Sequence, residues 1–166
     1  PCTCVNGACN DGVDGDGTCS SCRPGWAGPH CDLCDVQYHG ENCRTYRIYV
    51  DADATAGLGD GSSWPNAYSG RVGLQNAIEE FKEIPARTRR KIGHVEFWIA
   101  EGIYTPTSCE DPNACTPGER AKSFSDPGKL ADFFGGFIGN ETSLEQRDIL
   151  AHPTILSGNI DFSEEG

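Results

Sequence analysis

The pattern of apolar and polar positions changes sharply near Arg44. Before Arg44, aliphatic side chains are sparse and cysteine, glycine and aspartate dominate, so this stretch needs cross-links or metal to hold a fold. After Arg44, Tyr46, Ile48 and Val50 alternate with residues of the opposite face, the period of a strand. These patterns predict a small cross-linked domain over 1–44 and a second domain over 45–166. No Gly/Ser or Pro linker separates them, which predicts a fixed relation between the two.

The second domain is predicted to combine short strands with one amphipathic helix. Apolar residues recur at helical spacing from Leu74 to Ile84, and Pro85 ends that pattern. Strands are predicted over 46–51, 94–100, 133–138 and 154–160, and the strongly apolar 133–138 segment is predicted to be buried. The basic run at Arg87, Arg89, Arg90 and Lys91 is interpreted as a solvated loop that neutralises the acidic face of the helix.

Eight of the ten cysteines lie between Cys2 and Cys43, with the spacing C-x-C-x4-C-x9-C-x2-C-x8-C-x2-C-x8-C. The two C-x2-C units allow a four-thiolate zinc site, made of Cys19, Cys22, Cys31 and Cys34. The alternative uses all eight cysteines in four disulfides. Zinc would leave four cysteines without a role, so the count favours disulfides and hence an oxidising, extracellular compartment.

The residues between these cysteines are those of an EGF-type loop. Cys22-Arg-Pro-Gly-Trp-Ala-Gly-Pro-His-Cys31 has the glycine and aromatic positions of that loop, and Tyr38-His39-Gly40 repeats them before Cys43. The framework resembles a laminin-type EGF module, and the Asp-Gly run over 10–17 is similar to stabilin-like surface proteins. The resemblance implies four disulfides: Cys2–Cys9, Cys4–Cys19, Cys22–Cys31 and Cys34–Cys43.

Two further sites are suggested by the cysteines and acids that remain. Cys109 and Cys115 are predicted to form a fifth disulfide that closes their own loop. Asp11, Asp14 and Asp16 offer oxygen ligands for calcium, but their spacing is not that of a calcium-binding loop and no bidentate Glu follows. A solvated turn is the favoured interpretation of these aspartates, and no other metal or cofactor is predicted.

Residues 46–161 resemble the start of a right-handed parallel β-helix of the pectin-lyase-like superfamily, as in large secreted and surface proteins. The motifs that carry this resemblance follow one another along the chain: Tyr49-Val-Asp-Ala52, Asp60-Gly-Ser-Ser-Trp64, Leu74-Gln-Asn-Ala-Ile78, Val95-Glu-Phe-Trp-Ile-Ala100, Gly135-Gly-Phe-Ile-Gly-Asn140 and Pro153-Thr-Ile-Leu-Ser-Gly-Asn-Ile-Asp161. The implied fold class is mainly β, with a small EGF-like module, the first coils of a β-helix and one capping α-helix. The last strand carries no cap, so we expect further chain or another subunit to cover it.

The composition of the chain limits the classes of partner that it is expected to bind. The chain has 166 residues and a net charge of −12, from 25 acids and 13 bases, which argues against nucleic acid and anionic membranes. No apolar run has the length of a membrane-spanning helix. The chain has no Met and no apolar leader, so we expect a processed product or a piece of a longer chain.

These features predict a non-catalytic structural or adhesive component of an extracellular assembly, such as a filament subunit that binds copies of itself or other extracellular structural proteins. Two alternatives are kept. A polysaccharide lyase or hydrolase would use Arg147, Asp148 and Asp161, although no groove of several coils is predicted around them. A carbohydrate- or receptor-binding module would use Trp26 and Trp64, both of which fit packing positions better.

The remaining candidate residues concern the surface. Asn140-Glu-Thr142 is a sequon for an N-linked glycan in a predicted polar turn, whereas Asn113-Ala-Cys115 is the rare cysteine variant. The four histidines are scattered and are predicted to be ordinary surface residues: His30, His39, His94 and His152.

Overall fold

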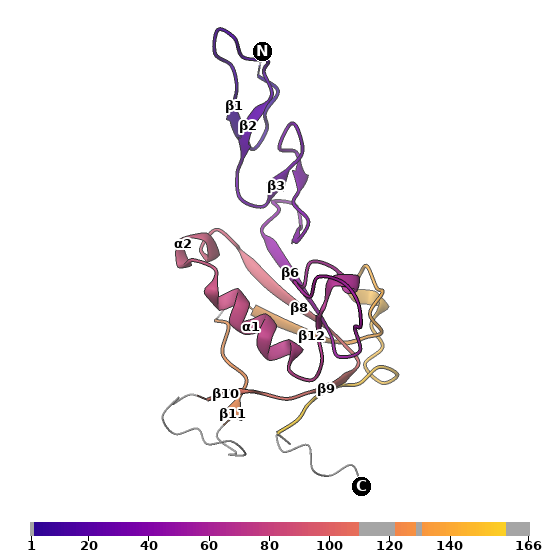
Figure 1. Cartoon of the computed structure of the whole chain (residues 1–166). Coiled ribbons are helices and arrows are strands. Elements are labelled where there is room, and N and C mark those ends of the chain that lie inside the picture. The colour runs from indigo at the N-terminus through magenta and orange to yellow at the C-terminus, as the bar shows by residue number, and fades with distance from the viewer. Residues whose placement is uncertain (1, 110–121, 129–130, 159–166) are drawn as a thin grey trace.

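The computed structural model describes residues 2–109, 122–128 and 131–158, and its regular structure there is mostly short strands (Figure 1). Five strands belong to the cysteine-rich module: β1 (Gly7–Cys9), β2 (Cys19–Cys22), β3 (Trp26–Ala27), β4 (Leu33–Cys34) and β5 (Tyr38–His39). β1 pairs with β2 and β3 with β4, both antiparallel, while β5 joins the sheet of the second part. The cross-linked module that the sequence predicts is therefore built from two small hairpins.

The second part is organised around parallel strands. Its elements are β6 (Thr45–Asp51), η1 (Trp64–Asn66), β7 (Tyr68–Ser69), α1 (Gly73–Glu83), α2 (Ala86–Arg89), β8 (His94–Ala100), β9 (Gly102–Tyr104), β10 (Ser108–Cys109), β11 (Lys122–Ser123), β12 (Ala131–Phe137), η2 (Leu144–Gln146) and β13 (Thr154–Leu156). The main sheet has the order β12–β8–β6–β5, in which β8 is parallel to β6 and β12 and β5 is antiparallel to β6. The short β7 pairs with β6 in parallel, β9 and β13 form a parallel pair, and β10 and β11 an antiparallel one. These are mixed sheets, and they do not by themselves show the β-helix that the resemblance implies.

The helical pattern predicted from Leu74 onward is confirmed by α1. Leu74, Ala77, Ile78 and Phe81 point into the core, as their spacing requires, and the helix ends before Pro85. The basic run predicted as a loop is instead part of a short helix, α2. Pro85 is the residue directly before this helix, a position where proline is tolerated because no internal hydrogen bond is lost.

Both faces of the main sheet are covered. On one face, α1 buries Ile48, Val50 and Phe97, and on the other Tyr49 packs with Trp64 and Trp98. The alternation in β6 places Tyr49 on the face opposite Ile48 and Val50, and that face is buried as well. The chain after β6 folds back over that face, and the backbone N–H of Tyr49 donates to the carbonyl of Gly61 at 3.0 Å.

The cysteine-rich module projects from the end of the sheet where β6 begins (Figure 1). Tyr46 on β6 contacts Tyr38 on β5 edge to face, with ring centroids 5.0 Å apart. Its hydroxyl donates to Oε1 of Gln37 at 2.7 Å. Strand pairing, ring contact and hydrogen bond therefore act together at one junction.

No helix in the described part of the chain has the length and apolar character needed to cross a membrane.

Candidate functional site

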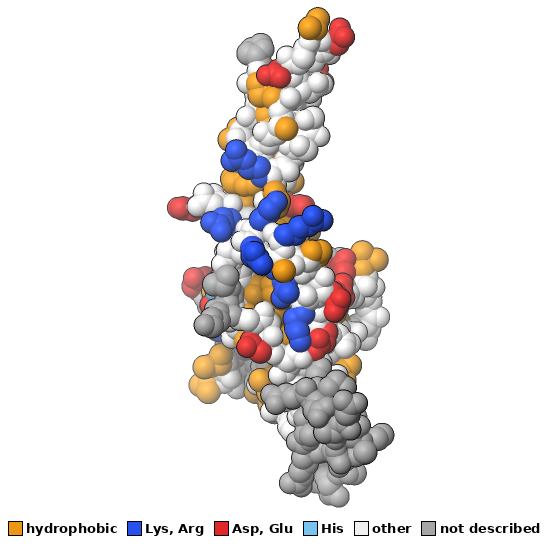
Figure 2. Space-filling model, turned by 90° about the vertical axis from the view of Figure 1, so that its left-hand side faces the viewer, with side chains coloured by type: hydrophobic (Ala, Val, Ile, Leu, Met, Phe, Trp, Pro, Cys, Tyr) orange, Lys and Arg blue, Asp and Glu red, His pale blue; other side chains and the backbone are white. Residues whose placement is uncertain are grey.

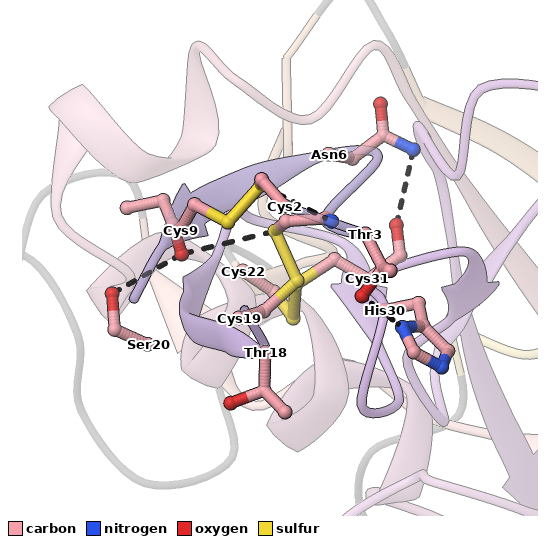
Figure 3. Close-up of a disulfide and its surroundings, with 12 residues drawn as sticks. Cys2, Thr3, Asn6, Cys9, Thr18, Cys19, Ser20, Cys22, His30 and Cys31 are labelled. Atoms are coloured by element: carbon pink, nitrogen blue, oxygen red, sulfur yellow. Dashed lines mark hydrogen bonds between the residues drawn. A yellow bond between two sulfur atoms is a disulfide. The ribbon is translucent and has the colours of Figure 1, made fainter. Parts of the chain in front are cut away.

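The disulfides of the module are those that the EGF resemblance implies. The structure contains Cys2–Cys9, Cys4–Cys19, Cys22–Cys31 and Cys34–Cys43. Hydrogen bonds support them (Figure 3): the Asn6 amide donates to the carbonyl of Cys31 at 3.1 Å, and Ser20 Oγ donates to the carbonyl of Ala8 at 3.1 Å. The module has too few apolar residues to form a hydrophobic core, and the disulfides stabilise it instead.

The cysteines of the alternative zinc site are used in these disulfides. The sulfur atoms of Cys4, Cys19 and Cys31 lie close enough for a metal, but they belong to two neighbouring bridges and are not thiolates. The calcium candidates are not brought together either. Asp16 accepts hydrogen bonds from Thr18, which lower its pKa, while Asp11 and Asp14 are exposed and belong to no ligand cluster among the residues that the structure describes.

The fifth predicted disulfide involves Cys115, which lies outside the described residues, so that bridge stays a prediction. The sequon residue Asn140 is described. It is exposed, in the irregular segment between β12 and η2, and it lines a depression of about 510 Å³ together with Tyr49 and Trp64. An exposed asparagine outside regular structure is accessible to modification.

Glu141, which the sequence analysis did not single out, organises the segment around Asn140. Its carboxylate accepts backbone N–H groups from Ile138 at 2.6 Å and from Gly139 and Asn140, each at 3.0 Å. Only 6% of Glu141 is exposed, and its own carbonyl accepts the indole N–H of Trp64 at 2.8 Å. Burial alone would raise the pKa of Glu141, but the backbone hydrogen bonds outweigh burial and hold it below its usual value. A sequon offers no signal for this role, because its middle residue is unspecified.

The described candidates for a lyase or hydrolase site are occupied in structural contacts. Arg147 lies over the ring of Phe134, 5.2 Å from its centroid, and its Nε donates to the carbonyl of Leu144 at 3.1 Å. Asp148 accepts the backbone N–H groups of Leu150 and Ala151, which lower its pKa. These are the contacts of turn residues. Asp161 lies outside the described residues.

The histidines and tryptophans occupy packing or pairing positions. His30, His94 and His152 contact Thr3, Asp132 and Glu101 respectively, at 2.9 to 3.0 Å. His39 departs from the surface role predicted for it: its Nε2 is hidden and has no partner among the described residues, and burial followed by the charge of Arg47 lowers its pKa. Trp64 is buried and Trp26 is half-buried in a hairpin, which fits the packing positions predicted for them.

The strongest candidate surface is the outer edge of β12. Ile48, Phe97 and Phe133 occupy matching positions on β6, β8 and β12, and the rings of Phe97 and Phe133 stack with centroids 4.8 Å apart. Exposure along this row is 3% for Ile48, 0% for Phe97 and 45% for Phe133. The row therefore ends on an aromatic ring that is covered on one side only.

The next strand of the chain continues this surface. β13 pairs with β9, and its Ile155 and Leu156 are exposed. Thr154 ties β13 to the main sheet, since its Oγ1 donates to the carbonyl of Ala100 at 3.1 Å. An apolar pocket of about 250 Å³ opens beside Phe133 and Leu156 and is floored by Leu74 and Ile78 of α1. In the described part of the chain, no strand pairs with the free side of β12 or β13.

The sequence predicted an open last strand at 154–160, of which 154–156 form β13 and 159–160 lie outside the described residues. It also predicted that the apolar segment 133–138 is buried. Phe133 and Ile138 are exposed, which corrects that expectation. The hydrophobic run does not indicate this exposure, because the burial of a side chain on a strand depends on whether another strand pairs beside it. Comparison of the chain with protein-family models, curated proteins and solved structures gives no significant match.

Proposed function

We propose that this protein is a non-catalytic structural or adhesive component of an extracellular assembly, a glycosylated filament subunit whose β12–β13 edge is covered by further strands. The observation that carries the proposal is the row Ile48–Phe97–Phe133, which is buried at two strands and open at the third. An exposed apolar strand edge adds strands readily, because its backbone groups and its side chains gain partners together.

The proposal includes the finer fold that the two resemblances imply. β8–β9 and β12–β13 are successive segments whose strands pair in parallel, β8 with β12 and β9 with β13. This supports the first coils of a right-handed parallel β-helix, with α1 covering one face of the first strands. The four disulfide pairings support a laminin-type EGF module and, with it, an oxidising extracellular compartment.

Magnitudes favour an extended contact over a single added strand. Covering the exposed parts of Phe133, Ile155 and Leu156 contributes about 1 kcal/mol each. The sum is smaller than the roughly 4–15 kcal/mol that association costs in lost freedom of motion. A partner must therefore cover the whole edge, including its backbone groups. Another coil or a repeated subunit meets that requirement.

The test introduces charge at the edge and follows assembly. We expect Ile155→Lys/Leu156→Lys to weaken concentration-dependent assembly in sedimentation velocity and to remove filaments from electron micrographs, because lysine blocks edge pairing. Val36→Lys, at an exposed position of the module, is the matched control and should assemble normally. A wild-type protein that stays monomeric at high concentration, with fast hydrogen exchange along β13, would contradict the proposal.

A further inference from the structure

A second surface combines an apolar floor with a basic rim, at the place where α2 meets the sheet. The cavity there has a volume of about 260 Å³. Phe81, Ile92 and Val95 form its floor and are themselves buried, while Arg89 and Arg90 stand at its rim. An apolar floor surrounded by charge is the arrangement of a recognition pocket in which water is excluded from the centre.

The basic rim is larger than these two side chains. Arg87 and Lys91 are exposed next to them, and the carbonyl of Arg44 accepts the N–H groups of Gly93 and His94, which places Arg44 alongside. Figure 2 shows blue side chains gathered on the face of the molecule where α2 lies, with orange ones between them. Among the described residues, no ion pair is formed by these cations, so the predicted neutralisation of the acidic helix face does not run through direct ion pairs. The protein as a whole is acidic, with a net charge of −12, yet this face is basic and can attract an anionic partner.

The loop over residues 10–17 carries the complementary pattern. The backbone N–H of Gly15 donates to the carbonyl of Gly12 at 2.8 Å, which makes a turn with Val13 and Asp14 at its corners. Val13 is fully exposed, and Asp14 and nearby Asp11 are exposed with no hydrogen bond or ion pair among the described residues. One apolar side chain therefore projects beside two free carboxylates.

The loop has a defined shape before any partner binds. Asp16 accepts the backbone N–H of Thr18 at 3.0 Å, its hydroxyl at 2.6 Å and the Asn10 amide at 3.3 Å. The N–H of Gly17 also donates to the carbonyl of Asn10 at 2.9 Å, which closes the base of the loop. A preorganised loop loses less conformational entropy on binding, so a larger part of its contact energy contributes to the affinity.

We propose that the 10–17 loop of one molecule docks into the α2 pocket of a second copy. Val13 would cover the floor made by Phe81, Ile92 and Val95, and Asp11 and Asp14 would pair with the arginines of the rim. The contact is between molecules, because the loop lies at the end of the module far from α2 (Figure 1). It joins two different surfaces, so it is heterologous and leads to open chains or closed rings. The contact uses neither β12 nor β13, so it can be tested separately from the proposed edge contact.

Charge reversal on the loop tests this contact. In low salt we expect Asp11→Arg/Asp14→Arg to weaken self-association in sedimentation velocity by at least about tenfold, since like charges would then face each other across the interface. The matched control is Asp32→Arg/Glu41→Arg, which makes the same change in net charge at two exposed acids of the same module. It should leave this association near the wild-type value.

A mixing experiment separates the proposed contact from a general effect of charge. Arg87→Glu/Arg90→Glu should weaken self-association to a similar extent, yet an equimolar mixture with Asp11→Arg/Asp14→Arg should associate more strongly than either variant alone. In that mixture, both the natural loop–pocket pair and the charge-reversed pair are complementary. Failure of the mixture to associate, or equal weakening by the control pair, would overturn the inference.

A different anionic partner is the competing outcome. If Arg87→Glu/Arg90→Glu abolishes binding of dextran sulfate while self-association is unchanged, the pocket recognises a sulfated polysaccharide and the loop contact is wrong. If Ile155→Lys/Leu156→Lys abolishes assembly and the loop variants do not alter it, the edge proposal stands and the loop contact is again wrong.

Discussion

Single residues set the local geometry around Asn140, and Glu141 is the decisive one. We expect Glu141→Gln to lower the free energy of unfolding at pH 7 by about 1–3 kcal/mol, because three backbone N–H groups lose a charged acceptor. The pKa of Glu141 is lowered in the folded state, so its contribution is present above the unfolded pKa of about 4.5 and is lost as the pH falls through the folded value. Urea unfolding at pH 7 and near pH 3 should show the gap between wild type and variant narrowing. Asn140→Gln, one residue away and exposed, is the control.

The neighbouring Asn140 is predicted to carry an N-linked glycan. Material from an oxidising secretory source should lose mass on treatment with an N-glycosidase, and Asn140→Gln should remove that shift. The exposed side chain and the irregular backbone after β12 leave room for a glycan. The variant should unfold within about 0.5 kcal/mol of the unglycosylated wild type, since no buried contact is lost. An unchanged mass in the natural material would contradict the prediction.

Some residue-scale features could not be found in the sequence. Arg47 and Glu96 form an ion pair at 3.1 Å, and Arg47 also lies over the ring of Trp98, 3.7 Å from its centroid. The two charges come from strands that are far apart in the chain, and only the register of β6 against β8 brings them together. The disulfide pairings were available beforehand because a resemblance implied them, not because spacing alone selects them.

At the scale of elements, local periodicity predicted α1, β6 and β8, because each has a clear buried stripe or alternation. Periodicity could not determine the burial of a side chain where a second layer of the structure decides it. Tyr49 is covered by the chain that follows β6, whereas Phe133 lies on β12, beyond which no further strand is paired among the described residues. Whether a strand is central or at an edge depends on contacts distant in sequence, so a hydrophobic run cannot report it.

The row of side chains across β6, β8 and β12 gives a direct test at this scale. Phe97→Ala should lower the free energy of unfolding by about 3–5 kcal/mol, because it leaves a cavity between two filled neighbours. Phe133→Ala should cost only about 1 kcal/mol in the monomer, since half of that side chain is already in water. Chemical denaturation of both variants checks the contrast. Equal losses would mean that Phe133 is covered and that the row does not end at β12.

For the molecule as a whole, the junction between module and sheet decides whether this is a rigid unit or a tethered pair. The absence of a linker predicted rigidity, and the structure adds β5–β6 pairing and the contacts of Tyr46 with Tyr38 and Gln37. Burial, followed by the nearby Tyr38, raises the pKa of Tyr46 to about 12, as expected of a hydroxyl enclosed in the junction. A rigid projecting module would hold the 10–17 loop in one direction relative to the pocket of the next molecule.

Residual dipolar couplings can measure this rigidity. The module and the sheet of the wild-type protein should fit one alignment tensor, because strand pairing and ring contact restrain the same junction. Tyr46→Phe keeps the ring and loses only the hydrogen bond to Gln37, so it should still fit one tensor. Tyr46→Ala removes the ring contacts with Tyr38 and Phe81 and should give two tensors of different magnitude, while all four disulfides stay intact. Two tensors already in the wild type would show that the module moves freely, and a fixed direction for the loop could then play no part in assembly.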